Sequence, residues 1–106
     1  MEQTERIRRM EERLDAALAA LRAVNAALDI YETALKDIAA LDAYLGGADW
    51  RADLAADEAG ALPRDLKRGV LSEDGIYGML EDNISLRSRF RDLAERLYPG
   101  ETVAGE

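Results

Sequence analysis

Charged side chains gather in the middle of the chain, and this is the first place where the sequence could support chemistry. Clustered carboxylates are the oxygen ligands that Mg²⁺ and Ca²⁺ take in proteins, so a metal site is one hypothesis. We expect instead that Asp49 caps a helix and that Glu73 and Asp74 interact favourably with the positive end of a helix dipole. The other carboxylates are expected to pair with basic side chains or to face water. The acidic residues are Asp49, Asp53, Asp57, Glu58, Asp65, Glu73 and Asp74, and the basic ones are Arg51, Arg64, Lys67 and Arg68.

The end of this segment suggests a second hypothesis, the binding of a small anion. Ser72 is predicted to begin a helix, whose first N–H groups attract anions, and Lys67 and Arg68 come just before it. Glu73 and Asp74 already place negative charge at that helix start. We therefore favour a structural role for these residues.

A third acidic set, Glu11, Glu12 and Asp15, lies near the N-terminus. Acidic residues at helical spacing resemble those of all-helical nucleotide pyrophosphohydrolases, whose Mg²⁺ sites are built from carboxylates. No matching acidic set faces inward on the last predicted helix, so we expect a solvated helix face. The sequence thus predicts no catalytic, cofactor-binding or metal-binding residue, and a carboxylate-metal enzyme or an anion binder remains the alternative.

Composition narrows the function further. The sequence contains no Cys and no His, which excludes thiol catalysis, disulfides and imidazole acid–base chemistry. The formal net charge of −8 repels nucleic acid and anionic lipid. No apolar run is typical of a signal peptide or a membrane span. We expect a cytoplasmic protein with no nucleic-acid or membrane partner.

The element that must organise these residues is a long helix predicted over residues 4–45, with Thr4 as its N-cap. No Gly or Pro interrupts it, and its Ala, Leu, Glu and Arg residues favour a helix. Apolar residues recur every three and four positions, which predicts a seam that packs against another helix. The seam consists of Ile7, Met10, Leu14, Ala17, Leu21, Val24, Leu28, Tyr31, Leu35, Ile38 and Leu45.

A connector over residues 47–71 is predicted to contain two short helical pieces. Asp49 is the expected N-cap of the first piece, about residues 50–58, which Gly60 ends, and Pro63 is expected to open a single turn over residues 63–68. We interpret Trp50 as a structural anchor of this connector rather than a platform for a ligand.

The last helix is predicted over residues 72–98, followed by a tail over residues 99–106. Ser72 is its expected N-cap, and Leu71 and Ile76 occupy the two positions of a hydrophobic staple. The prediction is therefore an all-α single domain over residues 1–106, in which a long helix, a two-piece connector and a shorter antiparallel helix follow one another.

Three stretches carry a resemblance to a known family: ERIRRMEERLDAAL near the N-terminus, the W-x-x-D at Trp50 and Asp53, and PRDLKRGVLSEDGIYGML. Together they resemble the small bacterial family named domain of unknown function 4298. The resemblance implies an all-helical fold in a bacterial cytosolic setting and carries over no activity and no site residue. Leu54 stands where an aromatic is expected, and Gly75 and Gly78 stand where better helix formers are usual, so we expect looser packing there.

Helix lengths lead to the final expectation, an interface. The first helix spans roughly 63 Å and the last only about 39 Å at 1.5 Å per residue, so an antiparallel return covers the seam back to about Val24 or Leu21. Ile7, Met10, Leu14 and Leu18 then lack a partner within the chain. The sequence predicts that the N-terminal half of the first helix pairs with a second copy of the chain, or with another helical protein.

Overall fold

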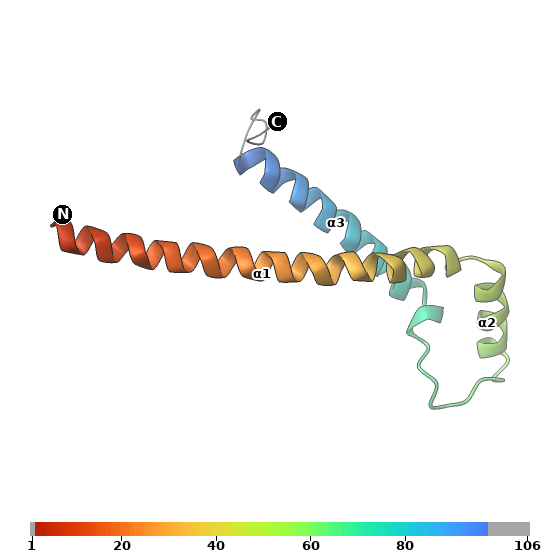
Figure 1. The fold of residues 1–106 in the computed structure, drawn as a ribbon. Helices are drawn as coiled ribbons and strands as arrows, with labels where there is room; N and C mark the ends of the chain where they lie inside the picture. The colour runs from red at the N-terminus through yellow and green to blue at the C-terminus, as the bar shows by residue number, and fades with distance from the viewer. Residues whose placement is uncertain (1, 98–106) are drawn as a thin grey trace. The chain divides into compact units, whose positions relative to one another are not determined.

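The computed structural model describes residues 2–97, apart from the side chain of Glu73. It contains the helices α1 (Gln3–Tyr44), α2 (Ala48–Glu58) and α3 (Glu73–Leu97), with a 3₁₀ turn, η1 (Gly69–Leu71), before α3 (Figure 1). No strand occurs in this part of the chain. The all-α class is confirmed, with a long N-terminal helix, a short connector and a shorter C-terminal helix.

The chain divides between Ala39 and Ala40 into two compact units. The first unit consists of most of α1, and the second holds the end of α1 together with α2, η1 and α3. The expectations of a single domain and of an antiparallel return of α3 onto α1 stay predictions. The predicted end of the last helix at residue 98 and the tail over residues 99–106 lie outside the described residues.

The N-terminus of α1 is capped by Glu2, and not by Thr4 as the sequence suggested. The Glu2 carboxylate accepts the backbone N–H groups of Thr4 at 3.0 Å and Glu5 at 3.2 Å. These two hydrogen bonds satisfy N–H groups that have no partner within the helix. They favour the charged carboxylate and hold the pKa of Glu2 below its usual value of 4.5.

Gly46 ends α1 and Gly60 follows the end of α2, and both take the left-handed conformation, with φ of 75° and 71°. That conformation costs a residue with a Cβ atom free energy, which explains Gly at each position. Helix α2 begins at Ala48, after Gly47, and no side chain caps it. The prediction of Asp49 as its N-cap is therefore wrong, because Asp49 already lies in the first turn.

The predicted helical turn over residues 63–68 is also wrong. In a helix the Pro63 carbonyl would accept the N–H four residues later, but here it accepts the N–H of Leu66 at 3.2 Å and Nη2 of Arg68 at 2.7 Å. These bonds close a tight turn instead. The second helical piece of the connector is η1, which begins at Gly69, one residue after the predicted turn.

The start of α3 follows the sequence prediction closely. The Ser72 hydroxyl accepts the N–H of Gly75 at 3.2 Å and donates to the Gly69 carbonyl at 2.9 Å. Leu71 and Ile76, the predicted staple, are buried, with 8% and 3% of their surface exposed. The staple therefore forms the small apolar centre of the second unit.

Gly75 corrects the expectation of loose packing. A Cβ atom on Gly75 would overlap the carbonyl oxygen of Gly69 and lie 3.1 Å from the Ser72 hydroxyl oxygen. Gly78, one turn later, would meet nothing within 4 Å. The first turn of α3 therefore packs tightly against η1 because residue 75 has no side chain.

Candidate functional site

The acidic connector was the first candidate site, and Asp53 within it is used to join two helices. The Tyr44 hydroxyl, at the end of α1, donates to Oδ2 of Asp53 on α2 at 2.6 Å. This hydrogen bond, then partial desolvation and the charges of Asp53 and Asp49, raise the pKa of Tyr44 to about 12. Asp53 is thus a structural acceptor, held by a phenol that stays neutral at physiological pH.

Two further interactions fix the connector in the second unit. The indole N–H of Trp50 donates to the Val70 carbonyl at 3.0 Å, which ties α2 to η1. Nε of Arg68 lies 3.2 Å from Oδ1 of Asp57, and both side chains are about one-third exposed, at 34% and 31%. Trp50 itself is half-buried, and its hydrogen bond supports the prediction of a structural anchor.

The metal hypothesis gains no support from this geometry. In the described part of the chain, no three or more acidic side chains are placed to hold a metal ion. Asp53 and Asp57 are engaged as above, and Asp49 lies in the first turn of α2. The N-terminal set of Glu11, Glu12 and Asp15 is exposed on α1.

The hypothesis of an anion site at the start of α3 also gains no support from the geometry. Ser72 already accepts one N–H of the α3 terminus, and the Arg68 guanidinium is engaged with Asp57 and Pro63. An open hollow of about 410 Å³ lies nearby, lined by Leu45, Trp50, Asp74 and Tyr77. An anion in this hollow would face the Asp74 carboxylate and be repelled, so the hollow is not a suitable anion-binding site.

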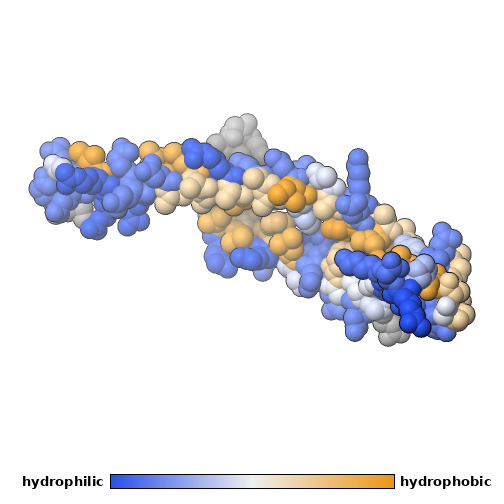
Figure 2. Space-filling model, turned by 90° about the horizontal axis from the view of Figure 1, so that it is seen from below, coloured by the Kyte–Doolittle hydropathy of each residue, from blue (hydrophilic) through white to orange (hydrophobic). Residues whose placement is uncertain are grey.

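The second candidate is the N-terminal half of α1, where the structure leaves large apolar side chains in solvent. Ile7, Met10, Leu14 and Leu18 are 54%, 53%, 51% and 40% exposed, and Leu21 and Val24, which the last helix was expected to reach, are exposed as well. We call these six residues the apolar stripe. In Figure 2, apolar patches interrupt the charged surface near this end of α1.

Comparison with known proteins agrees with the sequence resemblance. Residues 7–93 match the family described as domain of unknown function (DUF4298). The chain belongs to this family. No curated protein and no solved structure matches it. The family description names no activity.

The blocks that carried the resemblance have structural reasons in this DUF4298 chain. Trp50 and Asp53 of the W-x-x-D each bind another part of the second unit, and the GVLSEDGI run supplies η1, the Ser72 cap, the staple and Gly75. The sequence did not predict the hydrogen bond between Tyr44 and Asp53, because the two residues are nine positions apart on different helices and no local pattern links them. The unusual Gly near the start of a helix was the available signal for the close approach at Gly75.

No helix among the described residues is long and apolar enough to cross a bilayer. The apolar stripe is one of the apolar surfaces that the described residues leave exposed, and α3 exposes Ile84 and Leu97 as well.

Proposed function

We propose that this chain is a non-catalytic helix-pairing module, which associates with a second copy of itself through the apolar stripe on α1. The observation that carries the proposal is the exposure of six large apolar side chains along one helix, five of them at the core positions of a heptad pattern. Contiguous apolar surface of this kind marks protein interfaces. A bacterial cytoplasmic setting belongs to the same proposal, supported by the family resemblance and by the absence of Cys.

The physical need for a partner follows from α1 itself. None of its described residues is buried, although helices in water draw most of their stability from packing an apolar face. Covering the stripe with a second helix supplies that packing. The uninterrupted helix, without Gly or Pro from residue 3 to residue 44, offers no kink at which the stripe could fold back on itself.

The stability of such a dimer can be estimated from the stripe. Each side chain is about half exposed, so burying it contributes about 1 kcal/mol, or about 12 kcal/mol for both copies. Association costs about 4–15 kcal/mol in lost freedom. The gain is of the same size as the cost, so the extent of association should depend on the concentration of the chain.

Sedimentation at tens of micromolar tests the proposal, and the dimer mass is expected. Replacing Met10 and Leu14 with Glu should give the monomer mass while α2, η1 and the Trp50 fluorescence stay unchanged. A matched control replaces Ala19 and Ala26 with Glu, since both are exposed and lie opposite the stripe on the same helix, and it should remain dimeric. The monomer mass for the natural chain, or equal dissociation by the control, would defeat the proposal.

The alternatives from sequence, a carboxylate-metal enzyme and an anion binder, stay predictions. No arrangement of the described residues favours either one over helix pairing. A rise in melting temperature with millimolar Mg²⁺ or Ca²⁺ would reopen the first, because a ligand of the native state stabilises it.

A further inference from the structure

We infer that the two copies of α1 pair in parallel and in register, an inference that rests on the proposed self-association. Five residues of the stripe, together with Ala17, supply the core positions of three heptads, and Leu18 lies beside them on a flank. Ile7, Leu14 and Leu21 take the first core position, and Met10, Ala17 and Val24 take the second. The orientation is then set by the residues that flank this core on each side.

The charges on the two flanks of α1 differ in sign. One flank consists of the residues that directly precede the first core position of each heptad. It begins with the cations Arg6 and Arg13 and continues with apolar residues only: Ala20, Ala27, Ala34 and Leu41. The other flank consists of the residues that directly follow the second core position. It contains the anions Glu11 and Glu32, and its remaining residues are uncharged: Leu18, Asn25 and Ala39. All flanking cations are therefore on one side of the seam, and all flanking anions are on the other.

This segregation distinguishes the two orientations. In an antiparallel pair each flank meets the same flank of its partner. In any register, an Arg therefore meets another Arg or an uncharged residue, and a Glu meets another Glu or an uncharged residue. In a parallel pair each flank meets the opposite flank, five residues further along the partner. Flanking charges set orientation in coiled coils, and only the parallel arrangement makes an attractive pair here.

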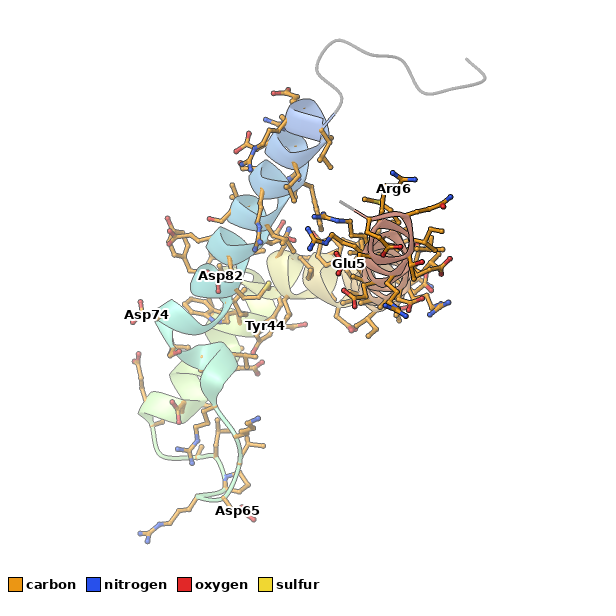
Figure 3. All side chains as sticks on the ribbon, turned by 90° about the vertical axis from the view of Figure 1, so that its left-hand side faces the viewer. Glu5, Arg6, Tyr44, Asp65, Asp74 and Asp82 are labelled. Atoms are coloured by element: carbon orange, nitrogen blue, oxygen red, sulfur yellow. The ribbon has the colours of Figure 1, made fainter. Side chains whose placement is uncertain are left out.

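The attractive pair joins Arg6 of one copy to Glu11 of the other, and symmetry makes it twice. Both side chains are exposed, and in the described part of the protomer neither is in an ion pair. Figure 3 shows the Arg6 side chain extending outward from α1. Arg13, one heptad later, meets Leu18 of the partner, where its aliphatic stem can cover the leucine without placing like charges together.

Cysteine cross-linking tests the orientation cleanly, because the chain has no Cys of its own. In a parallel pair, Met10→Cys places two thiols across the core at bonding distance. Glutathione disulfide is the oxidant: the two thiols lose two electrons and two protons, a disulfide forms, and two molecules of reduced glutathione are released. Ala19→Cys, on the outer face, is the control and should not cross-link.

The expected result is a covalent dimer from Met10→Cys alone, and likewise from Leu21→Cys alone. An antiparallel pair that covers the stripe sets residue 10 opposite residue 21, so neither variant would cross-link alone and only their mixture would. That outcome, with the dimer mass retained in sedimentation, would overturn the orientation and leave the proposed function standing. A monomer mass for the natural chain would remove both.

Charge reversal gives a second readout. Arg6→Glu should weaken self-association roughly tenfold, the equivalent of about 1.4 kcal/mol, and adding Glu11→Arg should restore it. Restoration supports the Arg6–Glu11 pair between copies. An equal or greater loss in the double variant would contradict it, because a parallel pair re-forms its attraction when both charges are exchanged.

Discussion

Gly75→Ala offers the sharpest test of how the second unit is held together. The added methyl would overlap the Gly69 carbonyl oxygen and lie 3.1 Å from the Ser72 hydroxyl oxygen. Both neighbours belong to η1 and the helix cap, and the carbonyl is backbone, so the strain cannot be relieved by turning a flexible side chain. The first turn of α3 must move away from η1.

The cost follows from the interactions that this movement breaks. Loss of the Ser72 cap and of its bond to Gly69 costs about 1 kcal/mol each, and the remaining overpacking adds about 1–3 kcal/mol. Replacing Gly with Ala in a helix by itself stabilises the folded state by about 1 kcal/mol, which offsets part of this loss. We expect a net loss of about 2–4 kcal/mol in the free energy of unfolding.

Gly78→Ala is the matched control, because a Cβ atom there meets nothing within 4 Å. It makes the same chemical change in the same helix, and it should stabilise the protein by about 0.5–1 kcal/mol. Urea unfolding followed by Trp50 fluorescence measures both variants, since the indole bonds directly to Val70 of η1. Shifts of the same sign for the two variants would refute the close approach at Gly75.

Further predictions follow from the same unit and from α1. Trp50→Phe should lower the free energy of unfolding by about 1 kcal/mol through loss of the bond to Val70, measured by circular dichroism in urea; no loss would contradict the anchor role. Tyr44 should ionise with a pKa of about 12, seen as a late rise in absorbance at alkaline pH that Tyr44→Phe abolishes. Because its folded pKa is raised, its contribution to stability is complete below the unfolded pKa of about 10 and is lost as the pH rises toward 12. Met10→Glu with Leu14→Glu should give the monomer mass in sedimentation, and Met10→Cys should form a disulfide-linked dimer.

The local elements of this protein could be predicted because their causes lie within a few residues of sequence. The uninterrupted run of helix formers predicted α1, the pair Gly46 and Gly47 marks its end, and the single Gly60 marks the end of α2. Ser72 and the staple of Leu71 and Ile76 followed from the spacing of a cap and its flanking apolar residues. Ile7, Met10 and Leu14 are exposed as expected, but so are Leu21, Val24 and Leu35, which the last helix was expected to cover, so the argument from unequal helix lengths stays a prediction.

What sequence reasoning missed depends on atoms that only the folded connector brings together. Pro63 does not start a helix, and its carbonyl accepts hydrogen bonds from the Leu66 N–H and the Arg68 side chain instead. Asp53, a metal-ligand candidate from composition, binds a hydroxyl nine residues away on another helix. Gly75 is required because the carbonyl of Gly69 approaches it, across a turn whose path no local pattern specifies. Periodicity and capping act over a single turn of helix, whereas these contacts are set by the route of the backbone between helices.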